Sequence, residues 1–206
     1  LTEEECRTLQ KKRVLVVGCG GLGGHIIDQL ARIGVGFLRV VDGDVFESSN
    51  LNRQLLSDVK RLGISKAKAA ADHVVRVNPD VSVEAVEEFL TESNAAALLA
   101  GCDVVMDALD NIASRKILAS ACSEAGIPYI YGAISGWVAQ AAVSMPGDGL
   151  IETLYPEDVV IADKSVLSFT PALCASMQAS LCVKLLAGPI WSMSLHPLPR
   201  LPSPAP

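Results

Sequence analysis

The residues best suited to chemistry are a glycine-rich turn and the charged side chains that follow it. Gly18, Gly20 and Gly23 come directly after a β-branched run that begins at Val14, and a helical pattern starts at Gly21. A strand, a glycine-rich turn and a helix in this order bring backbone N–H groups close to a phosphate, and the last glycine lets the helix pack against the strand. We therefore predict a nucleotide-phosphate loop over residues 18–23.

An acidic residue ends the next predicted strand. Asp42 follows Gly18 at an offset close to the ~20 residues at which dinucleotide-binding proteins place the acid that binds ribose hydroxyls. An oxidoreductase that binds NAD would need little more for this half of its cofactor. The glycine turn and Asp42 alone thus leave the class of nucleotide open.

Two cations and a later carboxylate favour a triphosphate. Arg53 and Lys66 follow in a polar loop and at the start of the next helix, and they exceed what a dinucleotide pyrophosphate needs. Asp110 follows a later buried strand and could hold Mg²⁺, which usually takes one or two carboxylates together with phosphate oxygens and water. Each side chain also has a structural alternative: a helix cap for Asp110 with Asn111, a solvated helix face for Lys66, and a surface charge for Arg53.

The elements that must position these residues alternate between strand and helix. Such alternation predicts an α/β fold, a Rossmann-like, doubly wound, mainly parallel sheet with helices on both faces. In the usual central order 3-2-1-4, the first, second and fourth strands are neighbours, and their carboxyl ends carry residues 18–23, Asp42 and residues 107–110. We predict that the ligand binds in the crevice at this switch point.

A last helix is predicted to open at Thr170 and Pro171 and to close at Gly188. Its apolar residues that recur every four positions are Leu173, Met177, Leu181 and Leu185. We predict that this stripe faces the core.

Composition excludes several classes of protein. The formal net charge of -6 leaves no footprint for nucleic acid or an anionic membrane, and the acidic N-terminus does not resemble a signal peptide. The two charge-free stretches of membrane-span length, 125–147 and 165–183, contain Pro and polar residues, so we expect core elements instead of membrane spans. The six cysteines form no CxxC pair, which predicts reduced thiols in a cytoplasmic protein and no structural zinc.

Taken together, the motifs resemble the adenylation domain of the ubiquitin-activating superfamily, above all the bacterial sulfur-carrier adenylyltransferases of molybdopterin-synthase and thiamine biosynthesis. The resemblance covers roughly residues 13–188. The motifs that carry it are Gly18–Gly23 (GCGGLG), Asp42-x-Asp44, Ser49-Asn50-x-x-Arg53-Gln54, Lys66 and Leu109-Asp110-Asn111. Met177-Gln178-Ala179 and Lys184-Leu185-Leu186-Ala187-Gly188 also resemble the family's crossover helix and its end.

This resemblance implies an enzyme that joins the C-terminal glycine carboxylate of a small ubiquitin-like sulfur carrier, ending in Gly-Gly, to the α-phosphate of ATP. It implies ATP and Mg²⁺ as cofactors and a homodimer. By the same resemblance Asp42 would hold the ribose, Asn50 and Arg53 the phosphates, Lys66 the transition-state charge and Asp110 the magnesium. The other residues assigned to the nucleotide site are Gly18, Gly20, Gly21, Gly23, Asp44, Ser49 and Asn111.

The expected organisation is an N-terminal arm over residues 1–12, an ATP-binding adenylation domain over 13–190 and a disordered Pro-rich tail over 191–206. Residues 160–163 contain no cysteine where several members of the family carry one, so we predict that no cysteine is essential to adenylation. Cys174 and Cys182 are expected to be buried, whereas the helix N-terminus could lower the pKa of Cys19. The alternatives are an NAD-dependent oxidoreductase and a non-catalytic carrier-binding member of the family.

Overall fold

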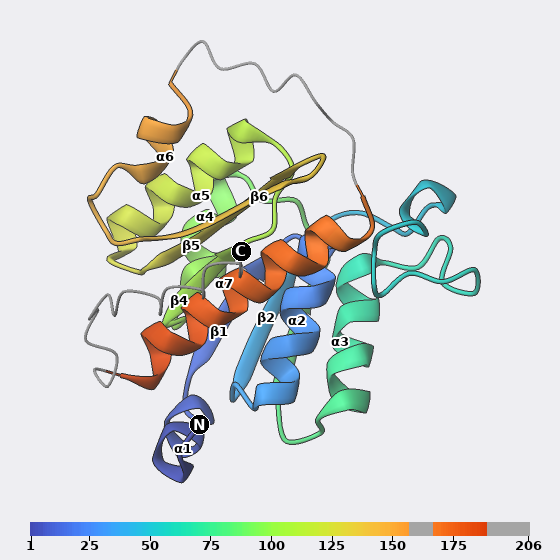
Figure 1. Ribbon diagram of the computed structural model, residues 1–206, viewed down its shortest axis with the longest axis horizontal. Coiled ribbons are helices and arrows are strands. Elements are labelled where there is room, and N and C mark those ends of the chain that lie inside the picture. The colour runs from blue at the N-terminus through green and yellow to red at the C-terminus, as the bar shows by residue number, and fades with distance from the viewer. Residues whose placement is uncertain (157–166, 189–206) are drawn as a thin grey trace, which may run out of the picture.

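The computed structural model describes residues 1–156 and 167–188, which form one six-stranded sheet with helices on both faces (Figure 1). The strand order is β3-β2-β1-β4-β5-β6. The strands are β1 (Arg13–Val17), β2 (Phe37–Val41), β3 (Ser82–Val86), β4 (Val104–Asp107), β5 (Tyr129–Ser135) and β6 (Val138–Ser144). All neighbouring strands pair in parallel except β5 and β6, which form an antiparallel hairpin. The predicted doubly wound, mainly parallel fold is confirmed, and it contains the expected central order 3-2-1-4.

Helices cover the two faces of the sheet in two groups. The helices are α1 (Glu3–Leu9), α2 (Gly21–Ile33), the 3₁₀ turn η1 (Ser48–Asn50), α3 (Lys66–Val77), α4 (Glu92–Leu99), α5 (Ile112–Ala125), α6 (Leu150–Leu154) and α7 (Phe169–Ala187). Helix α2 packs against α3 and α7, and α5 packs against α4 and α6. Each group buries its own apolar cluster against the sheet, so the central strands are covered on both sides.

The central strand β1 is as buried as its sequence predicts. Val14, Leu15 and Val16 are fully buried and Val17 nearly so, because parallel neighbours flank the strand and helices cover both of its faces. Helix α2 follows after the glycine turn and ends at Gly34, whose φ of 84° is the left-handed conformation that glycine adopts readily. The strand, turn and helix therefore form the predicted unit.

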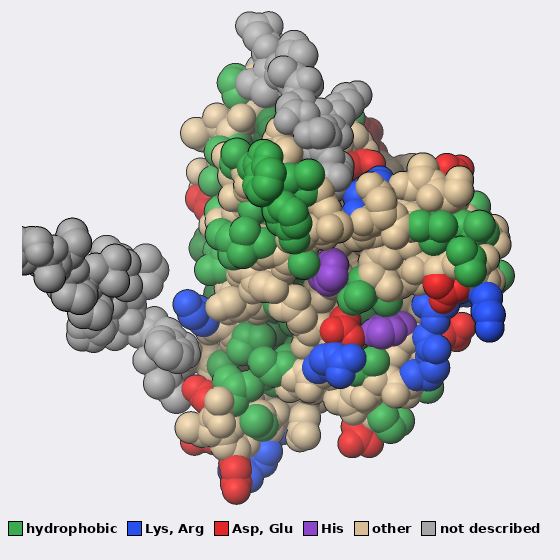
Figure 2. Space-filling view, turned by 45° about the vertical axis from the view of Figure 1, so that its right-hand side comes forward, with side chains coloured by type: hydrophobic (Ala, Val, Ile, Leu, Met, Phe, Trp, Pro, Cys, Tyr) green, Lys and Arg blue, Asp and Glu red, His purple; other side chains and the backbone are tan. Residues whose placement is uncertain are grey.

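Helix α7 corrects one prediction about its packing. Leu173 is 56% exposed and Met177 41%, so the first half of the stripe does not face the core as predicted. Leu181 and Leu185, in the second half, are partly buried and pack against the core cluster. Hydrophobic side chains gather on this outer face (Figure 2). The buried face carries mostly smaller residues instead, namely Cys174, Ala175, Gln178, Ala179, Cys182 and Leu186. Small side chains let α7 approach α2 and the sheet closely, and that close approach outweighs the periodicity of the leucines.

In length and composition α7 alone among the described helices could cross a membrane. Of its apolar window, 44% is buried inside the molecule, and a core helix of a soluble protein passes the same test. The N-terminal segment also packs against the domain, since Leu9 is fully buried and its carbonyl accepts a hydrogen bond from Gly36 N. The cysteine-free positions 160–163 and the predicted tail over 191–206 lie outside the described residues.

Candidate active site

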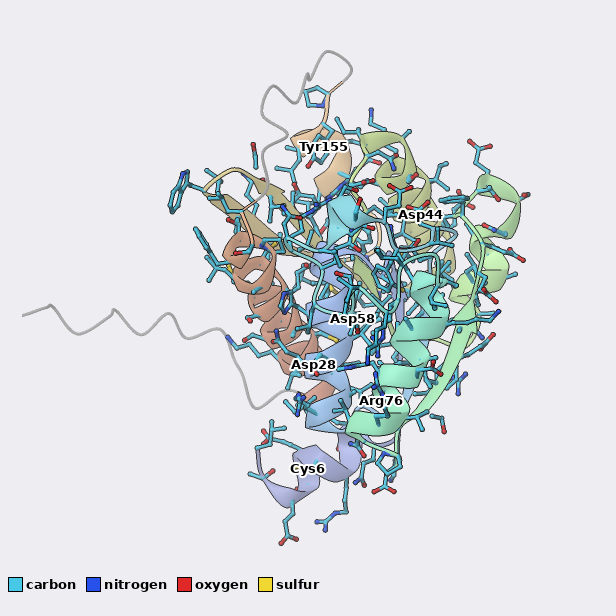
Figure 3. The ribbon with its side chains drawn as sticks, turned by 90° about the vertical axis from the view of Figure 1, so that its right-hand side faces the viewer. Cys6, Asp28, Asp44, Asp58, Arg76 and Tyr155 are labelled. Atoms are coloured by element: carbon cyan, nitrogen blue, oxygen red, sulfur yellow. The ribbon has the colours of Figure 1, made fainter. Side chains whose placement is uncertain are left out.

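A cavity of about 480 Å³ opens at the carboxyl ends of β1, β2 and β4. This volume lies within the ~300–1,000 Å³ of typical small-molecule sites. The residues of the predicted site that line it are Gly18, Gly20, Gly21, Asp42, Asp44, Arg53, Lys66, Asp110 and Asn111. Figure 3 shows Asp44 and Tyr155, which also lines the cavity, at the end of the molecule opposite Cys6. A second cavity of about 220 Å³, beside α5 and α6, contains none of the predicted residues.

The glycine turn brings β1 against the end of β4. Ala108 N donates to Val17 O, and a Cβ atom at Gly18 would lie 2.5 Å from Ala108 O. At Gly23 a Cβ atom would lie 1.8 Å from Gly18 O, so only glycine lets α2 pack this closely. Gly23 thus serves packing, and it does not line the cavity.

The N-terminus of α2 presents backbone N–H groups to the cavity. Its N-cap is Gly20, which has no side chain to bond to these groups, and the first turn contains no acidic residue. The uncapped N–H groups and the positive end of the helix dipole make such a terminus a site for anions. The turn therefore has the geometry of a phosphate site.

Gln54 is a cavity residue to which sequence reasoning assigned no role. It is buried beside Gly20, and its Oε1 has no hydrogen-bond partner among the described residues. An unpaired buried amide oxygen is costly and is satisfied by a donor from a ligand or a water molecule. Its position directly after Arg53 in the Ser-Asn-x-x-Arg-Gln motif was the available signal.

Asp42 ties the phosphate turn to the end of β2. Its Oδ2 accepts from Cys19 N at 2.7 Å and its Oδ1 from Asp44 N at 2.8 Å. Burial raises the pKa of this carboxyl, although the two backbone bonds and Lys66 oppose the shift. Each oxygen retains a free lone pair, so the carboxylate can still accept the hydroxyls of a ribose.

Both predicted cations line the cavity, and in this structure each is hydrogen-bonded to protein groups. Lys66 is buried, and its Nζ pairs with Asp44 Oδ2 at 2.9 Å. Arg53 is half-buried, and its Nη1 donates to Ser49 O at 2.9 Å and Asn52 Oδ1 at 2.8 Å. The structure thus contradicts the alternative in which Lys66 is a solvated face residue. Arg53 lines the cavity and bonds within its own loop, so its role toward a phosphate stays a prediction.

Ser49 and Asn50 do not line the cavity. Asn50 is buried, and its Oδ1 accepts from Glu47 N and thereby closes η1. The backbone carbonyl of Ser49 instead orients Arg53. In this structure the Ser-Asn segment shapes the loop that carries the cation.

At the end of β4 the cap and the candidate metal ligand are different residues. Asn111 is the N-cap of α5, since its Oδ1 accepts from Ser114 N at 2.8 Å. Asp110 is exposed at the cavity, and its Oδ1 lies 3.4 Å from Asn111 Nδ2. The alternative of a helix cap is therefore borne out for Asn111 but not for Asp110, whose carboxylate is available to a ligand.

Beneath Asp110 lies a buried ion pair that sequence reasoning missed. Asp107 Oδ2 accepts from Arg115 Nη1 at 2.9 Å and from the hydroxyl of Tyr129 at 2.5 Å. Burial raises the pKa of the Asp107 carboxyl, although Arg115 and Tyr129 both favour its charged form. The sequence placed Asp107 at the end of a strand, but nothing local indicated its partners on two other elements.

The cysteines offer no activated thiol. Burial, together with the nearby charge of Asp42, raises the pKa of Cys19 well above its usual value, so the expectation that the helix N-terminus lowers it is wrong. Burial also raises the pKa of Cys174 to about 11 and that of Cys182 to about 12. Thiols that are this weakly acidic contain little thiolate at neutral pH and are poor nucleophiles.

Comparison with known proteins shows which family the sequence matches. Residues 1–201 match the model of the ThiF family. The chain is 42% identical over 184 residues to SAMP-activating enzyme E1 of Haloferax volcanii, covering 86% of this chain and 68% of that one. It is 38% identical over 193 residues to the probable adenylyltransferase/sulfurtransferase MoeZ of Mycobacterium tuberculosis, covering 88% of this chain but only 49% of the relative.

The fold also recurs among solved structures. The Escherichia coli tRNA N6-threonylcarbamoyladenosine dehydratase in complex with ATP matches with a TM-score of 0.75, 22% identity and 89% of each chain covered. At this identity the likeness concerns the fold alone.

Proposed function

Because the chain belongs to the ThiF family, we propose that it is an ATP-dependent adenylyltransferase that activates the C-terminal glycine carboxylate of a small ubiquitin-like sulfur-carrier protein. The observation that carries this proposal is the cavity itself. One opening brings together an uncapped helix N-terminus, two cations and an exposed carboxylate. Relatives named as activating enzymes and adenylyltransferases support the same reaction. The proposal includes that this reaction takes place in the cytoplasm.

The reaction is a displacement at phosphorus. A carboxylate oxygen of the carrier attacks the α-phosphorus of ATP, the bond from that phosphorus to the bridging oxygen breaks, and pyrophosphate leaves. No protein nucleophile takes part, so catalysis rests on positioning and on charge stabilisation. This agrees with a cavity that contains cations and backbone donors, and with buried cysteines of raised pKa.

Each side chain has a role that follows from its place in the cavity. Asp42 accepts the ribose hydroxyls, and the N-terminus of α2 binds phosphate oxygens. Arg53 and Lys66 neutralise the charge that develops on the leaving pyrophosphate. Lys66 uses one of its three N–H donors on Asp44, which leaves two for phosphate oxygens.

The donor set fits a magnesium ion bound together with the nucleotide. Asp110 offers a hard oxygen ligand at the cavity, and the described residues contain no group of three or more His, Cys, Asp or Glu side chains that could hold a metal without help. Mg²⁺ in proteins commonly takes one or two carboxylates and fills its remaining positions with phosphate oxygens and water. When bound, the ion would neutralise phosphate charge; the predicted lack of structural zinc stays a prediction.

The proposal includes a homodimer that forms through the outer face of α7. Trp137, Val138, Phe169, Leu173 and Met177 are all exposed, and the rings of Trp137 and Phe169 lie 5.3 Å apart. We call these five residues the hairpin–helix patch. Contiguous apolar patches of this kind on a chain usually mark an interaction surface. Leu173→Asp with Met177→Asp should convert the dimer to a monomer in sedimentation experiments, whereas Val75→Asp on the exposed side of α3 should not.

The activity test is ATP–pyrophosphate exchange with a small ubiquitin-like protein that ends in Gly-Gly. Exchange should require that protein and should fail when its last glycine is removed. Tight binding of a nicotinamide cofactor without ATP binding would favour the oxidoreductase alternative. ATP and carrier binding without pyrophosphate release would instead identify a non-catalytic member of the family.

A further inference from the structure

We propose that Gln178 of α7 is a positioning residue that holds the Asp110 loop in register for adenylation, acting through the main chain of Asp107. The inference rests on the proposed function. Gln178 does not line the cavity, and neither the family match nor the sequence motifs assign it a role. Its place in the fold is unusual for a glutamine, because the side chain is fully buried between a helix and the sheet.

The amide of Gln178 bridges two strands where their pairing stops. The β4–β5 register ends with Met106 opposite Ile130. Gln178 Nε2 donates to Asp107 O at 2.7 Å, one residue past that end, and to Ile130 O at 3.2 Å. Both amide protons are therefore used on carbonyls of adjacent strands. The side chain thus donates to Asp107 O beyond the last β4–β5 pair, at the point where β4 turns toward the cavity.

Strand β5 leaves room for this amide at Gly132. Gly132 lies opposite Gln178, and a Cβ atom there would be 2.1 Å from the amide carbon of Gln178. The absence of a side chain at Gly132 is thus a steric requirement of the bridge. The backbone at this glycine does not need a positive φ, so the requirement is space and not conformation.

From Asp107 the constraint passes to Asp110 through the peptide groups of Leu109. Asp107 Oδ1 accepts from Leu109 N at 2.9 Å, and Arg115 Nη2 donates to Leu109 O. The N–H and the carbonyl of the residue before Asp110 are therefore both held by the buried ion pair. Gln178 holds the carbonyl of Asp107 itself, so its amide completes the constraint on the loop that carries the exposed carboxylate.

A side chain present only to fill space would not need to be an amide. Methionine has nearly the same length as glutamine and would fill the same volume, but it would leave Asp107 O without its donor. The carbonyl would then turn toward another partner, and the Asp110 loop would move with it. Displacement of a reacting group by about an ångström costs turnover more than it costs nucleotide binding at the opposite wall.

The test compares Gln178→Met and Gly132→Ala with Cys182→Ala, a buried substitution one turn further along α7. Gly132→Ala displaces the same amide from the facing strand, so it tests the inference even where Gln178→Met fails to fold. In the protein without nucleotide, hydrogen exchange of residues 108–111 should rise about tenfold in both variants, the value of one lost hydrogen bond. Hydrogen exchange in β2 should stay unchanged in these two variants. Cys182→Ala should change hydrogen exchange neither at residues 108–111 nor in β2.

With ATP bound, the affinity for Mn²⁺ measured by calorimetry should fall about tenfold in the same two variants. In the exchange assay kcat should fall about tenfold and KM for ATP should change less than about twofold, since the phosphate wall is not touched.

Unchanged hydrogen exchange at 108–111, unchanged Mn²⁺ affinity, or a KM that rises in step with the loss of kcat would each overturn the positioning role. A wild-type protein that catalyses no ATP–pyrophosphate exchange would refute the proposed function instead. The hydrogen-exchange measurement in the nucleotide-free protein would still decide whether Gln178 orders the loop.

Discussion

The two walls of the cavity are built differently. On the β1–β2 wall, the groups available to phosphate are backbone N–H groups and long cationic side chains whose partners are exposed or belong to a loop. Lys66 contacts Asp44, whose side chain is 55% exposed, and Arg53 contacts its own loop. On the β4–β5 wall a single carboxylate, Asp110, faces the ligand, and beneath it Asp107 and Arg115 are almost completely buried.

The difference matches what each wall must do. Cations that bind an incoming triphosphate must exchange their present partners for phosphate oxygens, so exposed partners cost little to release. A carboxylate that orients charge during the reaction must not move, so a buried and fully hydrogen-bonded support suits it. Substitutions on the first wall should therefore weaken binding, whereas substitutions beneath the second should weaken the fold.

The largest effect is expected for Arg115→Met. This substitution leaves Asp107 as a buried charge without its partner, which typically costs about 3–5 kcal/mol. Urea unfolding followed by circular dichroism measures the loss, and Lys116→Met on the exposed side of α5 is the matched control, with an expected change within ~0.5 kcal/mol. Equal stability of the two variants would mean that the second wall is no more rigid than the first.

On the first wall, Arg53→Ala should weaken ATP binding by about tenfold to a hundredfold, because a charge-assisted hydrogen bond to phosphate is lost. Calorimetry with Mg-ATP measures this change, and Lys60→Ala in the same loop is the control. The midpoint of unfolding should stay close to that of the wild type. ATP affinity that survives the loss of Arg53 would remove this residue from the site.

Two neighbouring residues at the end of β4, the helix cap Asn111 and the candidate metal ligand Asp110, should respond differently to substitution. The expected effects are smaller, but they separate the two roles. Asn111→Ala should lower stability by about 1 kcal/mol, since it removes the N-cap of α5. Asp110→Asn should leave the unfolding midpoint in place and abolish carrier-dependent exchange, because it removes the charge that a magnesium ion needs. Exchange that persists in the Asn variant would show that Asp110 is not the metal ligand.

The smallest effect is expected from alkylation of the cysteines. Iodoacetamide at pH 8 should modify Cys6, the one half-exposed thiol, and spare the other five, which are buried. The raised pKa values of about 11 for Cys174 and about 12 for Cys182 leave almost no thiolate at that pH. Mass spectrometry locates the modification. Loss of pyrophosphate exchange after alkylation would contradict a thiol-free mechanism.

Much of the first wall could be predicted from the sequence because its signals are local. The strand, glycine turn and helix follow each other directly, and Asp42 ends the next strand. The order of the central strands then follows from the alternation of elements and the handedness of crossovers. Even here the sequence did not show that Ser49 and Asn50 lie outside the cavity lining, since a motif does not show which of its side chains turn inward.

On the second wall Asp110 was predicted from the sequence, but the support beneath it was not, because most of its contacts are distant along the chain. Asp107 meets Tyr129 of β5 and Gln178 of α7, and no periodicity links these positions. Only the second half of the α7 stripe faces the core, because a four-residue repeat shows an apolar stripe but not whether another surface covers it. Only the closeness of α7 to the sheet, which its small residues permit, decides which side is buried.

The pairing of β1 with β4 also sets the order in which the protein can assemble during synthesis. Strands β1, β2 and β3 are complete by Val86, yet β4 begins only at Val104 and the amide that braces it arrives with residue 178. Contacts between segments so far apart form late, since closing a long loop is entropically costly. A nascent chain therefore holds a phosphate turn that faces no opposite wall, and competence to bind nucleotide arises only after residue 178 has been synthesised.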